Sequence, residues 1–174
     1  MTHRVSCLNA SCEAERAPAT LLVLGYGNPA RGDDGIGPAF IEQLERLGLP
    51  GVETRVDYQL CVEDAMDIGT FARVLFVDAS LDAAPPYRHY PLAPKLKPNR
   101  LDTHSLSPEA LIHLARTLFS ATTEASVIAI RGYSFEPFVE TLSAGAHANL
   151  QAALTACVNW IAETGRNRGA ANEL

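Results

Sequence analysis

Two adjacent carboxylates, Asp33 and Asp34, follow an apolar segment and a glycine-rich turn near the start of the chain. Residues 21–24 predict a buried parallel strand, and apolar residues at helical spacing from 36 to 47 predict the helix that follows. The two acids therefore occupy the loop at a strand's carboxyl end, together with Asn28. Ligands of open α/β sheets bind in the crevice outside these ends. The position of the loop favours a functional site.

A helix start offers a second explanation for these acids, because an acid can cap a helix or complement its dipole. This explanation fits Asp33 as well as a functional role does. It does not fit Asp34, since one cap is enough and a second acid adds like-charge repulsion that a bound cation would relieve. The surrounding glycines indicate tight turns and close backbone approach: Gly27, Gly32, Gly35 and Gly37.

The glycine loop does not fit a nucleotide-binding motif. A dinucleotide fingerprint needs glycines at its first, third and sixth positions, and counting from Gly25 places Ala30 at the sixth. Asp57 could imitate a ribose-binding acid, but the two loop acids would repel a pyrophosphate. A P-loop would need Gly-Lys-Ser/Thr after the glycines, which this sequence lacks. The pattern therefore argues against NAD and against nucleoside triphosphates.

Two further residues are placed to share the site. Asp78 ends a second apolar strand, and if that strand pairs in parallel with the first, Asp78 lies at the same sheet edge as Asp34. The simpler explanation for Asp78 is a turn cap. His104 lies in a loop ahead of a helix, from which it could close over the two acids. Two carboxylates and one imidazole suit a transition metal such as nickel, iron or zinc.

Alternating strands and helices predict an α/β fold. We expect one domain over 19–164, a three-layer sandwich in which a mostly parallel, twisted five-stranded sheet has helices on both faces. A leader over 1–18 and a tail over 165–174 are expected to lack structure. Strands are expected at 21–24, 52–58, 73–78, 87–90 and 126–131, the fourth at an edge because of nearby prolines. Helices are expected at 36–47, 62–68, 107–118 and 143–161.

Composition limits the partners. The formal net charge of −6 argues against nucleic acid and anionic membranes as the main partner. The sequence shows neither an apolar run that could cross a membrane nor an apolar signal core, so we expect a cytoplasmic protein. Its cysteines form no CxxC pair, and we expect Cys61 and Cys157 to be reduced and buried. The spacing of His3, Cys7 and Cys12 matches no standard zinc module.

The chain resembles the hydrogenase maturation proteases, endopeptidases specific for nickel-iron hydrogenase large subunits. Three motifs carry the resemblance across about residues 20–163, and the first is the most specific. They are Gly-Tyr-Gly-Asn leading to Asp-Asp-Gly-Ile-Gly, then Asp78 followed by alanine, then the Thr-His-Ser loop of His104. Gln-Leu at 59–60 with Glu-Asp at 63–64 is more similar to the branch that serves bidirectional, NAD-linked hydrogenases.

The resemblance implies a reaction on another protein. The family removes a short C-terminal extension from the large-subunit precursor after nickel has been inserted. By carry-over, Asp34, Asp78 and His104 contact the nickel of the precursor and are the catalytic residues, so the metal arrives with the substrate. Some members have glutamate where this chain has Asp34. Family members usually act as monomers, and the resemblance implies substrate or loop contacts for Gly27, Asn28 and Asp33.

Two mechanisms fit these residues. In the first, the nickel of the substrate orients the scissile segment and polarises its carbonyl or activates a water. In the second, Asp33 and Asp34 share a proton and activate water as an aspartyl-type dyad. The same residues also fit a chaperone that binds nickel or the precursor without cutting it. Turnover distinguishes the two classes, because only a peptidase changes the mass of the precursor.

Overall fold

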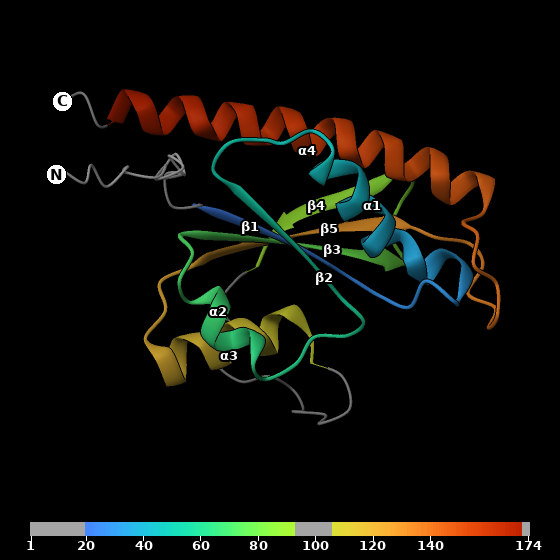
Figure 1. The fold of residues 1–174 in the computed structure, drawn as a ribbon, viewed down its shortest axis with the longest axis horizontal. Helices are drawn as coiled ribbons and strands as arrows, with labels where there is room; N and C mark the ends of the chain where they lie inside the picture. The colour runs from blue at the N-terminus through green and yellow to red at the C-terminus, as the bar shows by residue number, and fades with distance from the viewer. Residues whose placement is uncertain (1–19, 93–105, 172–174) are drawn as a thin grey trace, which may run out of the picture.

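The computed structural model describes residues 20–92 and 106–171, with side chains up to residue 165. In these residues a five-stranded sheet lies between two layers of helices, so the predicted α/β sandwich is confirmed (Figure 1). The strands are β1 (Leu21–Tyr26), β2 (Val52–Asp57), β3 (Arg73–Ser80), β4 (Tyr87–Pro91) and β5 (Glu124–Arg131). The helices are η1 (Gly32–Gly35, 3-10), α1 (Ile36–Glu45), α2 (Asp64–Ile68), α3 (Pro108–Phe119) and α4 (Ala144–Ala171).

The sheet has the strand order β2-β1-β3-β5-β4. β1, β2, β3 and β5 are parallel, and β4 pairs antiparallel with β5 at an edge, as its prolines predict. From β1 the chain goes first to β2 on one side and then crosses to β3 on the other. Such a reversal of direction creates a crevice at the carboxyl ends of the two strands. The crevice between β1 and β3 is therefore the expected place for a ligand.

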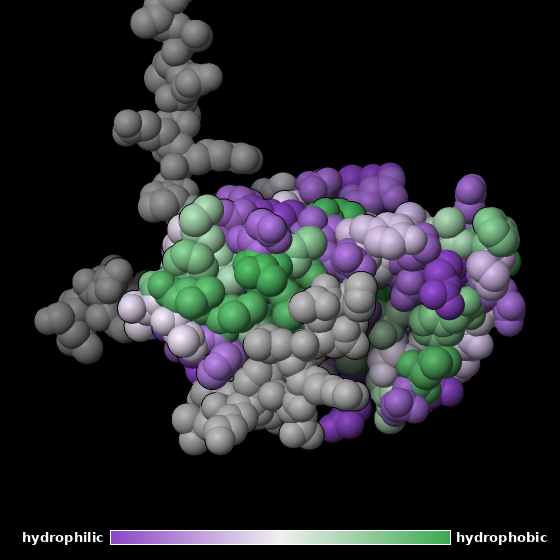
Figure 2. Space-filling model, turned by 90° about the horizontal axis from the view of Figure 1, so that it is seen from below, coloured by the Kyte–Doolittle hydropathy of each residue, from purple (hydrophilic) through white to green (hydrophobic). Residues whose placement is uncertain are grey.

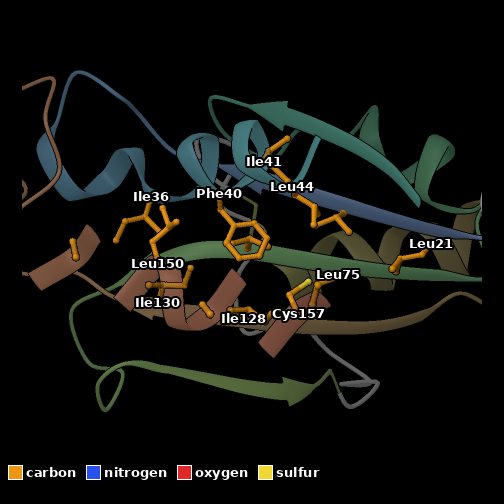
Figure 3. Close-up of a cluster of buried hydrophobic side chains, with 14 residues drawn as sticks. Leu21, Ile36, Phe40, Ile41, Leu44, Leu75, Ile128, Ile130, Leu150 and Cys157 are labelled. Atoms are coloured by element: carbon orange, nitrogen blue, oxygen red, sulfur yellow. The ribbon is translucent and has the colours of Figure 1, made fainter. Parts of the chain in front are cut away.

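The sheet is buried on both faces, which explains the continuous apolar sequence of β1. Alternate residues of the strand point to opposite faces. Leu21 and Val23 pack with Phe40 and Cys157 in the core under α1 and α4 (Figure 3). Leu22 and Leu24 belong to a second core, under α2 and α3. Both cores hold the parallel strands in register and so fix where their carboxyl ends lie.

Glycines allow α1 to start directly against the end of β1. A β-carbon on Gly37 would overlap the backbone of Tyr26, and one on Gly25 would overlap the carbonyl oxygen of Gly37. Only hydrogen at these positions permits so close an approach. The short turn η1 is thereby held beside the crevice.

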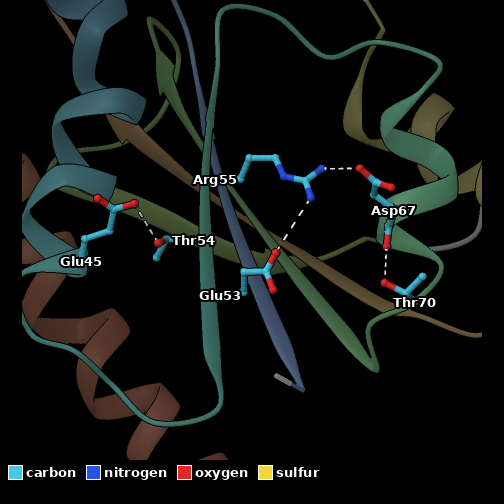
Figure 4. A network of polar contacts seen from close by, with 6 residues as sticks. All are labelled: Glu45, Glu53, Thr54, Arg55, Asp67 and Thr70. Carbon is cyan, nitrogen blue, oxygen red and sulfur yellow. Dashed lines mark hydrogen bonds and ion pairs between the residues drawn. The ribbon is translucent and has the colours of Figure 1, made fainter. Parts of the chain in front are cut away.

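Edge strand β2 is connected to the helices on both faces of the sheet (Figure 4). Arg55 lies 2.8 Å from the carboxylate of Asp67 on α2 and 3.9 Å from Glu53. On the other face, Thr54 donates a 2.9 Å hydrogen bond to Glu45 of α1. Contacts at such exposed positions contribute about 0–1 kcal/mol each. They position the edge strand, while the two cores supply the stability of the fold.

The structure corrects several details of the sequence-based prediction. Cys157 is buried as expected, but Cys61 is exposed, because it lies in the loop before α2 and not in a core element. Leu47 lies beyond the end of α1 and is exposed. Helix α4 continues past residue 165 into the predicted tail, since the sequence there has no proline to stop it. The predicted leader and His104 lie outside the described residues.

Ser107 caps α3, because its hydroxyl oxygen accepts a 3.3 Å hydrogen bond from the backbone N–H of Ala110. Pro108 occupies the first position of the helix, where its missing N–H costs nothing. Within the part of the chain that the structure describes, no helix has the length and apolar character needed to cross a membrane.

Candidate functional site

Asp34 and Asp78 lie at the same edge of the sheet. β1 and β3 are parallel neighbours whose last paired residues are Gly25 and Val77, and Asp78 follows directly. Asp34 lies in η1, beyond the end of β1, and its charge contributes to the pKa of Asp78. The structure therefore brings two of the three predicted catalytic residues to the crevice between β1 and β3.

The backbone of the glycine loop orients Asp34. The N–H of Asn28 donates a 3.0 Å hydrogen bond to Oδ2 of Asp34. Gly27 has a φ of +135°, and a β-carbon there would overlap the carbonyl oxygen of Asp34. A side chain rarely adopts that backbone conformation and would not fit in this space. Gly27 is therefore needed to let the loop close around Asp34.

Asn28 shapes the loop through its side chain. Its Oδ1 accepts a 2.8 Å hydrogen bond from the N–H of Ala30, which forms a tight Asx-type turn. Its Nδ2 donates a hydrogen bond to the hydroxyl oxygen of Tyr58, just after β2. Asn28 thus connects the loop of Asp34 to the end of the neighbouring strand, and a role in loop architecture accounts for it.

Asp33 is fully buried and holds two distant loops together. Its carboxylate accepts hydrogen bonds from the N–H groups of Tyr133, Ser134 and Ser143, at 2.7, 3.0 and 2.7 Å, and from the Ser143 hydroxyl at 2.8 Å. Its own N–H donates to the carbonyl of Ser134 at 2.7 Å. Neither η1 nor α1 has a side-chain cap. The helix-cap explanation of Asp33 is therefore wrong. Asp33 instead holds the loop between β5 and α4 through these hydrogen bonds.

The aspartyl dyad of Asp33 and Asp34 is not supported. Burial alone would raise the pKa of Asp33, but the hydrogen bonds from Tyr133, Ser143 and Ser134 outweigh it and lower the pKa below its ordinary value. A carboxylate that accepts four hydrogen bonds in its ionised form has no proton to share. The two adjacent acids therefore have different roles. Asp33 holds the loop after β5, and Asp34 remains the candidate for chemistry at the crevice.

Asp78 has the opposite electrostatic environment. Burial is the main reason that its pKa rises to about 6, and the negative charge of Asp34 adds to the rise. Hydrogen bonds from the Tyr26 hydroxyl and from the N–H of Ala79 counteract part of it. A carboxyl with such a pKa can hold or release a proton near neutral pH, and a cation in the crevice would keep it ionised.

Sequence reasoning missed Tyr26, although it lies inside the glycine motif. It ends β1 beside Asp78, and burial followed by the Asp78 charge raises its pKa far above the ordinary value. Tyr90 on β4 and Glu109 in the first turn of α3 are close enough to add to this shift. The parallel register of β1 and β3 would have identified Tyr26, because Tyr26 and Asp78 directly follow its last pair, Gly25 and Val77.

The third predicted ligand, His104, lies outside the described residues. Within 20–92 and 106–171, no group of three or more His, Cys, Asp or Glu side chains could hold a metal ion. The described part of the site therefore offers two carboxylates from neighbouring strand ends. Two carboxylates alone are fewer donors than a closed metal site has.

The fold is that of the hydrogenase maturation peptidases. A hydrogenase 2 maturation peptidase from Thaumarchaeota archaeon SCGC_AB-539-E09 matches with 25% identity and a TM-score of 0.60, over 81% of this chain and 97% of that chain. The endopeptidase HybD from E. coli matches with 23% identity and a TM-score of 0.68, over 83% and 93%. HycI from Thermococcus kodakarensis KOD1, a [NiFe] hydrogenase maturation protease, has 20% identity and a TM-score of 0.64, over 81% and 91%. No protein-family model and no curated protein sequence matches the chain.

These structures confirm the resemblance that the three sequence motifs predict. The chain spans almost the full length of each of them. All three are named as peptidases or proteases, which supports the prediction of a hydrolase that acts on peptide bonds. The branch that serves bidirectional hydrogenases stays a prediction.

Proposed function

We propose that this chain, which has the fold of the hydrogenase maturation peptidases, removes the C-terminal extension from the large-subunit precursor of a nickel-iron hydrogenase. The observation that carries the proposal is the pair Asp34 and Asp78 at the crevice between β1 and β3. Both acids lie where the parallel strands end, which is where ligands of open α/β sheets bind. We expect the protein to act as a monomer in the cytoplasm.

Nickel belongs to the substrate in this proposal. Asp34 and Asp78 would each offer carboxylate oxygen to the nickel of a loaded precursor, and His104 would add an imidazole nitrogen. Carboxylate and imidazole are suitable donors for a borderline metal such as nickel. The bound metal would act as a Lewis acid toward the scissile carbonyl or a water. A precursor without nickel would lack this anchor, so the peptidase would recognise the loaded state.

The remaining residues of the site position these donors. The N–H of Asn28 holds one oxygen of Asp34, and the hydroxyl of Tyr26 donates to Asp78. The carboxylate oxygen of Asp78 that does not bind nickel could accept a proton from an attacking water and return it to the leaving amine. The site thus combines substrate orientation with proton transfer, and the chain needs no serine or cysteine nucleophile.

The test is processing of a purified nickel-loaded precursor by site variants. Asp34→Asn, Asp78→Asn and His104→Ala should each lower the cleavage rate at least about a hundredfold, as expected for groups that act on the reacting atoms. Asp82→Asn is the matched control, because Asp82 is an exposed acid just after β3. It should cleave at the wild-type rate. Full activity of the Asp34 and Asp78 variants would contradict the site.

A further inference from the structure

Exposed apolar side chains follow the parallel strands at the same edge of the sheet as the candidate site. Each parallel strand other than β1 is followed by at least one of them, and parallel strands end at the same edge of the sheet. The exposed fractions are 64% for Tyr58 after β2, 57% for Leu81 after β3, and 48% and 94% for Tyr133 and Phe138 after β5. We call these four residues the carboxyl-edge rim. β1 itself is followed by the loop of Asp34, and it lies between β2 and β3 in the sheet, so rim residues follow the strands on both sides of this loop.

Hydrogen bonds connect the rim to the loop that carries Asp34. Tyr58 accepts a hydrogen bond from Asn28, whose backbone N–H in turn holds Asp34. On the other side, Arg31 pairs with Val139 in an isolated bridge, and the N–H of Gly32 donates a 2.6 Å hydrogen bond to the Val139 carbonyl. Phe138 therefore lies one residue from the segment that leads into Asp34.

Phe138 is the most unusual member of the rim. It has a φ of 64°, in the left-handed region that a residue with a β-carbon rarely adopts, and its ring contributes almost nothing to the core. Its loop is nevertheless fixed, because the buried carboxylate of Asp33 binds residues 133, 134 and 143. Aromatic residues, Phe included, are enriched where proteins contact each other, and this ring is held outward on a fixed loop.

We propose that the carboxyl-edge rim is the docking surface for the protein substrate, with Phe138 as its main anchor. The partner is a folded protein or tail that presents apolar side chains beside the bond to be cut. Continuity with the site supports this occupant, since Tyr58 and the residue after Phe138 are both bonded to the loop that carries Asp34. The inference depends on the proposed function, because it assigns the substrate contacts of the same site.

A second group of exposed apolar side chains provides the control. It lies on the face formed by α2 and α3, where Figure 2 shows apolar side chains gathered, and comprises Met66, Leu118 and Phe119. Leu118 is 59% exposed, almost the same as Leu81 in the rim. Leu118 lies in the last turn of α3, shortly before β5 begins, and so lies toward the opposite edge of the sheet. Leu118→Ala is therefore the matched control for Leu81→Ala.

The experiment compares Phe138→Ala, Leu81→Ala and Leu118→Ala in cleavage of the nickel-loaded precursor. Affinity for the precursor is measured in parallel on the Asp78→Asn background, where cleavage does not interfere, and each rim variant is compared with Asp78→Asn alone because that change removes one nickel ligand from all of them. Phe138→Ala should raise the KM and the dissociation constant at least about tenfold, as for an aromatic anchor of an interface. Leu81→Ala should raise both values less, and Leu118→Ala should leave both unchanged.

Unchanged KM and affinity in Phe138→Ala, with normal cleavage by the wild type, would overturn the docking surface and leave the proposed function intact. Absence of cleavage by the wild type itself would instead contradict the proposed function. Light scattering tests whether the rim instead binds a second copy of the chain. If the wild type is a dimer and Phe138→Ala a monomer, the rim is a self-interface and the inference is wrong.

Discussion

Replacing Asp33 by asparagine should destabilise the protein strongly, although the change keeps the shape of the side chain. Asp33 is 0% exposed and accepts four hydrogen bonds, three of them from backbone N–H groups. An amide has only one oxygen, so its NH2 group must face at least one of these donors. The variant therefore places two donors against each other in a buried site.

The size of the effect follows from the four hydrogen bonds. A buried donor left without an acceptor costs about 1–3 kcal/mol. Each remaining bond loses the assistance of the negative charge, which halves its strength of about 1.5–3 kcal/mol. Allowing for non-additivity, we expect the free energy of unfolding to fall by about 3–5 kcal/mol. In a domain of this size that corresponds to a melting temperature lower by roughly 10 °C.

Urea unfolding followed by circular dichroism measures this change, and Asp34→Asn is the matched control. Asp34 is half-buried and accepts one hydrogen bond from a backbone N–H, so its variant should lose less than about 1 kcal/mol. A lowered pKa in the folded state means that Asp33 stabilises the fold above its unfolded pKa of about 4 and loses this effect in acid. If Asp33→Asn unfolds within 1 kcal/mol of the wild type, the assigned role of Asp33 is wrong.

Three further changes test the site. Gly27→Ala should cost at least about 2 kcal/mol and lower the cleavage rate, because a β-carbon would displace Asp34; unaltered urea unfolding would contradict this. Asp78 has a raised pKa of about 6, so its ionisation destabilises the fold as the pH increases from 4 to 6. The free energy of unfolding of Asp78→Asn should therefore rise relative to that of the wild type across this range, and the difference should stay constant above it. Tyr26→Phe removes a hydrogen bond that lowers the pKa of Asp78. In the pH profile of kcat/KM for cleavage, the acid limb should therefore move to higher pH by about one unit. An acid limb that does not move would exclude this hydrogen bond.

The sequence was sufficient for the architecture because its strands and helices differ clearly in period and length. The apolar run of β1 and the prolines around β4 distinguish a buried central strand from an edge strand. Element ends were less predictable. The residues around position 165 contain no signal that shows whether α4 ends there. The exposure of Cys61 depends on a loop whose path is set by distant contacts.

The candidate site, too, was only partly predictable from the sequence. Asp34 and Asp78 could be brought together from sequence, because both follow apolar strands that parallel pairing aligns. The role of Asp33 could not, since its hydrogen-bond donors lie about a hundred positions later in the chain. Nor does local sequence reveal the exposure of Phe138, which follows from the way the loop after β5 is fastened.

The most direct test of the account compares nickel-loaded and nickel-free large-subunit precursor from the same cell. Each is incubated with the purified protein, and its mass is followed by intact mass spectrometry. The account predicts that a C-terminal fragment is lost only from the loaded precursor. An unchanged mass of both precursors together with tight binding would contradict it and indicate a chaperone, and equal cleavage of both would contradict recognition through nickel.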